Sequence, residues 1–253
     1  MLGITINEKI GVGDGLQFSS LPENYFRATG RKLIDVSKPW FFDHNPYVMR
    51  DADLSGVKIQ EMWNFGHNKR FKWPMPRGEH RPLVYTCNAE IWASVFGVDV
   101  TLNRPRLYRF ETYPYEKRKL ILLQVEGKSH GRMPHHVIEH VLEKYDGTHL
   151  YQIGLKDERL GIPYLKTDTL WDLAQVIAES RMLICLDSGP SWIGAAYPDV
   201  VVKKLRTRPT LDVLKDWAPL DIHNIHSHWD DRCHQIFNPS EHDVGFTSAY
   251  TKI

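Results

Sequence analysis

The chain has 253 residues, of which 42% are hydrophobic and 25% charged, and its formal net charge at pH 7 is +1. This composition is that of an ordinary globular protein and argues against a disordered chain. Because no stretch concentrates basic residues, it also gives no reason to expect a nucleic-acid partner. We expect two domains, residues 1–115 and 116–253, because a Pro-rich, charged stretch at 103–119 is typical of a linker.

No part of the chain has the pattern of an export signal or a membrane span. The opening MLGITINEKIG lacks a basic lead and an apolar core, and no later run holds about 18 consecutive apolar residues. Three widely spaced cysteines, Cys87, Cys185 and Cys233, argue against a disulfide framework. We therefore expect a cytoplasmic protein without a transmembrane segment.

The first half predicts a strand at residues 4–6, a glycine-rich turn at 11–15 (GVGDG) and a helix at 15–28. Further elements predicted in this half are strands at 32–36 and 57–63 and a helix at 88–95 that ends at Gly97. The turn lacks the complete phosphate-binding fingerprints that contain glycine. Taken alone it is more typical of a tight turn, but Asp14 projects from it and could accept a proton from an attacking hydroxyl.

In the second half, apolar runs alternate with amphipathic segments. Strands are predicted at residues 120–125, 150–153, 182–186 and 200–202, and helices after Pro134 and at 169–180. Thr169 is expected to be an N-cap. Such alternation indicates parallel strands, whose ligands bind beyond the carboxyl ends. The loops at 126–132, 154–159 and 187–191 are therefore the candidate site.

The stretch CLDSGP places Asp187 and Ser188 at a strand end and Gly189 and Pro190 at a helix start. Backbone N–H groups at a helix start can bind phosphate, while the two side chains could meet sugar hydroxyls. Alternatively, Asp187 or Ser188 only caps the helix. The spacing does not decide between these interpretations.

Four blocks in order resemble glycosyltransferase family 9, the lipopolysaccharide heptosyltransferases. They are KIGVGDGLQFSSLPENYFRATG, LILLQVEGKSHGRMPHHVIEHVLEKY, YQIGLKDE and DTLWDLAQVIAESRMLICLDSGPSWIGAAY. The similarity is good over most of residues 119–202 and over about the first thirty residues. Residues 40–85 and those after Arg206 are poorly covered.

The resemblance implies an α/β protein of the GT-B type, with two Rossmann-like halves and mainly parallel sheets facing a cleft. It implies an inverting, metal-independent transferase without a required cofactor, which moves a heptose or hexose-like sugar from a nucleotide-diphosphate donor to a glycan or glycolipid. An ADP-linked donor is favoured, with UDP and GDP as alternatives. A glycolipid acceptor would bring transient contact with a membrane surface.

The resemblance also implies site residues. Asp14 matches the general base, and the residues expected to bind the donor are Gly13, Lys128, Arg132, Gly154, Lys156, Glu158, Asp187, Ser188, Gly189 and Pro190. One loop departs from the family, because Glu126 and Gly127 replace hydroxyl residues and Met133 replaces a Trp before Pro134. That departure puts the identity of the donor in question.

Two further features allow other interpretations. The stretch DIHNIHSHWDDRCH, residues 221–234, is rich in groups that bind metals, but its spacing matches no zinc pattern and is more typical of a polar surface. The alternative function is a non-catalytic module that binds nucleotides or glycans on the same fold. A nicotinamide-dependent oxidoreductase is disfavoured because the dinucleotide fingerprint is missing.

Overall fold

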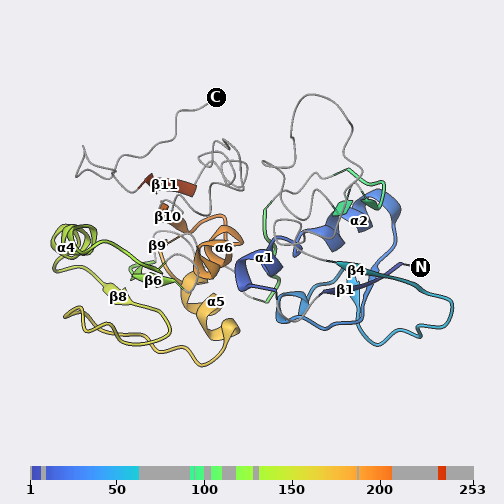
Figure 1. The fold of residues 1–253 in the computed structure, drawn as a ribbon, viewed down its shortest axis with the longest axis horizontal. Helices are drawn as coiled ribbons and strands as arrows, with labels where there is room; N and C mark the ends of the chain where they lie inside the picture. Colours follow the sequence, from blue (N-terminus) through green and yellow to red (C-terminus); the bar gives the residue numbers. More distant parts are fainter. Residues whose placement is uncertain are drawn as a thin grey trace. The chain divides into compact units, whose positions relative to one another are not determined.

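The structure is a computed structural model that describes residues 2–6, 10–62, 92–93, 95–99, 104–109, 118–127, 131–186, 188–206 and 233–237 (Figure 1). The chain divides into two compact units, and the division falls after Arg109. Each unit contains a sheet whose described strands are all parallel. The predicted α/β class with mainly parallel sheets is confirmed.

The first unit contains a four-stranded sheet in the order β3-β2-β1-β4. Its strands are β1 (Leu2–Ile6), β2 (Leu33–Asp35), β3 (Val48–Met49) and β4 (Lys58–Met62). The central strand β1 is flanked on both sides, with Gly3 opposite Ile34 of β2 and Ile59 of β4. The predicted strands at 4–6, 32–36 and 57–63 are therefore confirmed. Most of the predicted helix at 88–95 lies outside the described residues.

The prediction of a turn at GVGDG followed by one long helix is wrong. Residues 12–16 form a short helix, α1 (Val12–Leu16), in which the Gly15 N–H donates to the Gly11 carbonyl at 2.8 Å. A second helix, α2 (Leu21–Thr29), begins after a break at Gln17 to Ser20 and carries a proline in its first turn. The Ser19 hydroxyl donates to the Leu16 carbonyl at 2.6 Å and so closes α1. Proline is well suited to a helix start, which explains why α2 begins anew at this point.

The second unit contains a five-stranded sheet in the order β11-β10-β9-β5-β8. Its strands are β5 (Ile121–Leu123), β8 (Leu150–Gln152), β9 (Met182–Leu186), β10 (Val201–Arg206) and β11 (Cys233–Phe237). Its helices are α4 (His135–Lys144), α5 (Leu170–Ala178) and α6 (Gly189–Ala195). In chain order the first strand lies between the second and the third, so the direction of winding reverses between β5 and β9. Ligands of open parallel sheets bind at such a reversal.

The helices of the second unit cover both faces of its sheet (Figure 1). On one face, Ile121 and Leu123 of β5 and Ile184 of β9 pack with Val137 and Val141 of α4 in a buried core. On the other face lie α5 and α6. A methyl group on Gly194 of α6 would lie 2.7 Å from Val202 Cγ2 and 3.1 Å from Leu183 Cδ2. Gly194 therefore allows α6 to pack directly on the sheet.

The sequence predicted the start of α5 correctly. The Asp172 N–H donates to Thr169 Oγ1 at 3.1 Å, and the Thr169 N–H donates to Asp172 Oδ2 at 2.9 Å. This is a capping box, in which two residues satisfy each other's N–H groups. Among the helices of the described residues, none combines the length and the apolar character needed to cross a bilayer.

Candidate functional site

Two polar side chains meet where β5 and β9 end, at the reversal of the second sheet. Gln124 follows β5 and is buried, and Ser188 follows β9 and precedes α6. The Ser188 hydroxyl donates to Gln124 Oε1 at 3.0 Å, and the Gln124 N–H donates to the Ile184 carbonyl at 2.9 Å. Ser188 is the N-cap of α6 and forms a capping box with Ser191, whose Oγ accepts from the Ser188 N–H at 3.3 Å, and the Ser188 hydroxyl also contacts the neighbouring strand end. The start of α6 is thus anchored to β5.

A two-stranded hairpin covers this junction. It consists of β6 (Glu126–Gly127) and β7 (Gly131–Arg132), which are antiparallel. A methyl group on Gly127 would lie 3.4 Å from Ser188 Cβ and 3.6 Å from Leu186 Cδ1, so the β6 backbone packs closely on the start of α6. The hairpin therefore carries the side chains of Glu126 and Arg132 to the carboxyl edge of the sheet.

Four charged side chains at this edge form a network, which we call the charge quartet: Glu126, Arg132, Lys156 and Glu158. Lys156 Nζ lies 3.2 Å from Glu126 Oε2 and 3.4 Å from Glu158 Oε1. Arg132 Nη1 pairs with Glu158 Oε2. The Glu158 side chain is only 8% exposed, whereas Arg132 and Lys156 are 47% and 64% exposed. A buried carboxylate thus holds two cations whose outer sides face solvent.

The loop that carries Lys156 and Glu158 has a defined shape. It begins at Gly154, whose φ of +149° is a conformation that only glycine adopts readily. The Gln152 side chain, at the end of β8, donates to the Lys156 carbonyl at 3.0 Å, and the Tyr164 hydroxyl donates to the Gly154 carbonyl at 2.9 Å. These two bonds hold the loop to β8 and orient the quartet.

In the first unit, the catalytic candidate Asp14 lies in the first turn of α1 and is half-buried. Its carboxylate bends back over the helix start, since a methyl group on Gly11 would lie 3.3 Å from Asp14 Oδ2. A negative charge at this position is stabilised by the helix dipole. Gly13, predicted to contact the donor, belongs to the same helix.

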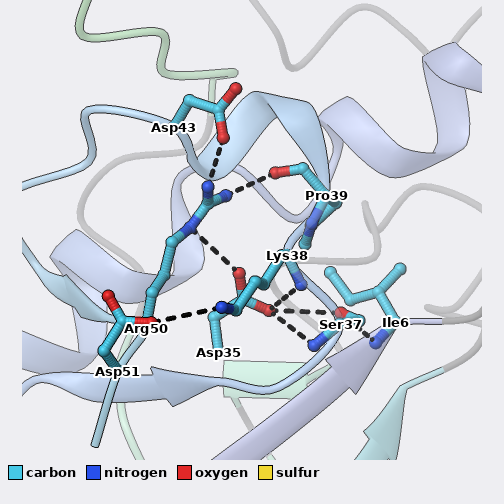
Figure 2. Close-up of polar contacts among 8 residues, drawn as sticks. All are labelled: Ile6, Asp35, Ser37, Lys38, Pro39, Asp43, Arg50 and Asp51. Atoms are coloured by element: carbon cyan, nitrogen blue, oxygen red, sulfur yellow. Dashed lines mark hydrogen bonds and ion pairs between the residues drawn. The ribbon is translucent and has the colours of Figure 1, made fainter.

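Next to this helix lies a polar cluster that sequence reasoning did not identify, shown in Figure 2. Asp35, the last residue of β2, is buried, and its Oδ1 accepts hydrogen bonds at 3.1 Å from the Ser37 N–H, the Ser37 hydroxyl and the Lys38 N–H. Its Oδ2 lies 3.4 Å from Arg50 Nε. Burial raises the pKa of the Asp35 carboxyl above its usual value, although these hydrogen bonds and Arg50 act in the opposite direction.

The structure brings most of the predicted donor residues together. Arg132, Lys156 and Glu158 are in direct contact, and Gly154 begins the loop that carries two of them. Ser188, Gly189 and Pro190 lie at the start of α6, beneath the hairpin. Three predicted donor residues remain. Gly13 lies in α1 of the first unit, and Lys128 and Asp187 lie outside the described residues.

Sequence reasoning missed Gln124, Gln152, Asp35 and Arg50. Three of these share one signal: Gln124, Gln152 and Asp35 are polar residues at the end of an apolar strand run. In the part of the chain that the structure describes, no group of three or more His, Cys, Asp or Glu residues could hold a metal ion. The histidine-rich stretch at 221–234 lies almost wholly outside that part.

Comparisons with known proteins identify the fold. No protein-family model matches the chain, and no curated protein matches it in sequence. Among solved structures, the chain is similar to the E. coli heptosyltransferase WaaC with ADP-2-deoxy-2-fluoro heptose, with a TM-score of 0.58 and 12% identity over 82% of this chain and 90% of that one.

Two further structures give the same result. The glycosyl transferase family 9 protein of Veillonella parvula DSM 2008 has a TM-score of 0.57 and 13% identity over 85% of this chain and 89% of that one. E. coli ADP-heptose lps heptosyltransferase II has a TM-score of 0.54 and 12% identity over 93% and 90%. At such low identity the likeness is one of fold. The resemblance to heptosyltransferases seen in the sequence is thus confirmed at the level of the fold.

Proposed function

We propose that the chain is an inverting glycosyltransferase that moves a sugar from a nucleotide-diphosphate donor to a glycan hydroxyl. The observation that carries this proposal is the charge quartet at the reversal of a parallel sheet. A nucleotide donor fits there because its diphosphate needs cations and backbone N–H groups at a strand–helix junction. The fold shared with heptosyltransferases favours this class of enzyme over other nucleotide-binding proteins.

The donor would lie along the carboxyl edge of the second unit. In this proposal, Arg132, Lys156 and the start of α6 contact the diphosphate, together with Lys128. The loop from Gly154 to Glu158 contacts the nucleoside, and Asp187 accepts hydrogen bonds from the donor sugar. An ADP-linked donor is the first choice because a solved structure of the same fold contains an ADP-sugar analogue.

The quartet has a consequence for donor binding. Its two cations are balanced by two carboxylates, so it carries no net charge of its own. Glu126 is 46% exposed and pairs with the outer cation Lys156, whereas Glu158 lies beneath both cations. A diphosphate would therefore replace Glu126 as the partner of Lys156, while Glu158 keeps both cations in place.

The acceptor would bind to the first unit, where Asp14 is the general base. The Asp14 carboxylate takes the proton of the acceptor hydroxyl while the acceptor oxygen forms a bond to the anomeric carbon of the donor sugar. The bond between that carbon and the diphosphate oxygen breaks, and the nucleoside diphosphate leaves from the opposite face with inversion. Arg132, Lys156 and the α6 amides stabilise the charge that develops on the leaving group.

The first experiment is a calorimetric panel of ADP, UDP, GDP and CMP, each with and without magnesium. It uses the wild-type chain, Asp187→Ala and the matched control Asp168→Ala. Asp168 is a suitable control because it is an exposed acid of the same unit that pairs with Lys166, outside the quartet. We expect one diphosphate to bind without magnesium and to bind less tightly to Asp187→Ala alone.

Binding and turnover are then separated. Release of ADP from ADP-heptose in the presence of a glycan acceptor, with the anomeric configuration of the product read by NMR, tests catalysis. Binding without turnover on any acceptor or donor would favour a non-catalytic nucleotide- or glycan-binding module instead. If no nucleotide binds, the donor site is assigned wrongly. The expected cytoplasmic location and a role in lipopolysaccharide or polysaccharide synthesis follow from the same proposal.

A further inference from the structure

We propose that Asp35 and Arg50 are positioning residues for Asp14, the catalytic base of the proposed function on which this inference rests. Neither residue belongs to α1. Instead, the two form a buried link between the segments that precede and support the helix carrying Asp14. All of these segments belong to the first unit, and Figure 2 shows how the side chains at the centre of the link converge.

The first connection runs to the end of β1. The Ile6 N–H donates to the Ser37 hydroxyl oxygen at 2.9 Å, and that hydroxyl in turn donates to Asp35 Oδ1 at 3.1 Å. Ile6 is the last residue of β1, and the chain reaches α1 only a few residues later. Asp35 also holds the turn in which Lys38 has a φ of +51°, a conformation that a residue with a side chain rarely adopts. The exit of β1 is therefore tied to the Asp35 carboxylate.

The second connection runs to α1 itself, through η1 (Trp40–Phe42). Arg50 contacts both ends of this short helix: Nη2 donates to the Pro39 carbonyl at 2.7 Å, and Nη1 pairs with Asp43. Phe41 of η1 is 2% exposed, and a methyl group on Gly15 would lie 2.7 Å from its Cε1. The ring of Phe41 thus lies directly against the residue that follows Asp14.

The ion pair between Asp35 and Arg50 joins these two connections. Arg50 uses three nitrogens on three partners, which only the planar guanidinium can do. Asp35 Oδ2 is buried, and no hydrogen bond from the described residues reaches it, so its interaction with Arg50 is essentially electrostatic. Buried ion pairs contribute little net stability compared with apolar residues, whereas they demand one geometry. The pair is therefore suited to fixing the position of α1.

The test compares Arg50→Lys and Asp35→Asn with Arg106→Lys as a matched control. Arg106 is 23% exposed against 25% for Arg50, and it also pairs with a buried carboxylate, that of Glu23. Lysine keeps the charge of Arg50 but cannot reach all three partners. The amide oxygen introduced by Asp35→Asn would still accept the bonds of the Lys38 turn, but the charge that faces Arg50 would be lost. The thermal stability of all three variants is measured first, and variants are compared at a temperature at which each of them is folded.

Two measurements are made on each variant. Amide hydrogen exchange of residues 12–16 is expected to rise about tenfold in both Arg50→Lys and Asp35→Asn and to stay unchanged in Arg106→Lys. Turnover of ADP-heptose is expected to fall by a factor of about 10 to 100, since a small displacement of a catalytic group has an effect of this size. The ADP dissociation constant is expected to stay the same, because the donor site belongs to the other unit.

A failure of the positioning role can be distinguished from a failure of the proposed function. Unchanged exchange in α1, or a loss of turnover equal to that of Arg106→Lys, would overturn the positioning role. A wild-type chain without turnover, or an Asp14→Asn variant with undiminished turnover, would overturn the proposed function. In that case the exchange measurement still decides whether Asp35 and Arg50 hold α1.

Discussion

The two units place charged side chains at the same location, the carboxyl edge of a parallel sheet, but they use them in opposite ways. In the first unit, the Asp35 carboxylate is buried, and Arg50, at 25% exposed, has its nitrogens directed at protein partners. In the second unit, Lys156 is 64% exposed and pairs with a Glu126 that is itself 46% exposed. The first cluster is closed on itself, whereas the second can exchange a partner.

This difference indicates a division of labour. A buried, fully directed ion pair resists rearrangement, because breaking it leaves a charge in a poorly solvated place. An exposed ion pair contributes little and can be replaced by a ligand at small cost. We therefore expect changes in the first unit to affect turnover and the position of the base, and changes in the second unit to affect the affinity for the nucleotide.

The largest effect is expected from Asp14→Asn. Losing a general base lowers turnover by a factor of about 10² to 10⁴, while the ADP dissociation constant stays unchanged. The rate of ADP release from ADP-heptose and calorimetry with ADP measure the two quantities. Asp53→Asn is the control, because Asp53 is an exposed acid of the same unit whose carboxylate accepts hydrogen bonds from the nearby Ser55. Equal losses in both variants would contradict a catalytic role.

A smaller effect is expected from Lys156→Gln, in the second unit. Removing one charge-assisted contact to the diphosphate should weaken ADP binding about tenfold and reduce its dependence on salt. Calorimetry at two salt concentrations measures both changes. Lys166→Gln is the matched control, since Lys166 is also an exposed lysine paired with an acid, Asp168. An unchanged ADP affinity in Lys156→Gln would contradict the expectation that changes at the edge of the second sheet affect nucleotide affinity.

The ADP affinity is expected to change in the opposite direction in Glu126→Gln. In the proposed donor site Glu126 competes with the diphosphate for Lys156, so removing the charge of Glu126 should tighten ADP binding by a factor of about two to five, the range of an exposed ion pair. Asp168→Asn should leave ADP binding as it is. Weaker ADP binding in Glu126→Gln would mean that Glu126 orients Lys156 toward the ligand instead of competing for it.

The smallest effect concerns the pH dependence of stability in the first unit. The folded-state pKa of Asp35 is raised above the ordinary value of 3.8, chiefly by burial, so the folded chain binds the proton more tightly than the unfolded chain. This contribution to stability is complete below 3.8 and is lost as the pH rises through the folded-state pKa. Asp35→Asn lacks it.

The free energy of unfolding of the wild type, minus that of Asp35→Asn, should therefore fall as the pH rises above 3.8, by at most about 1.4 kcal/mol per pH unit. Urea unfolding at several pH values measures this difference. A difference that grows with pH would mean that Arg50 and the hydrogen bonds outweigh burial, so that the pKa of Asp35 is lowered.

Much of the second unit could be predicted because its signals are local. The apolar runs at β5, β8 and β9, the proline before α4 and the Thr169 cap each act within a few residues. In the first unit, glycine content alone was misleading at GVGDG. Gly11 and Gly15 are joined by a helical hydrogen bond, and Gly15 allows the close approach of Phe41, which is distant in sequence.

Local residue patterns were thus sufficient for the α/β class, for most strands and helices and for the loops at the strand ends. Tertiary structure decided which of those loops meet. The order of the strands places Gln124 beside Ser188, and chain folding brings Glu158 to Arg132 and Arg50 to Asp35. These contacts join residues far apart in sequence, and their energies depend on burial and distance. Neither quantity exists until the sheets and their covering helices have formed.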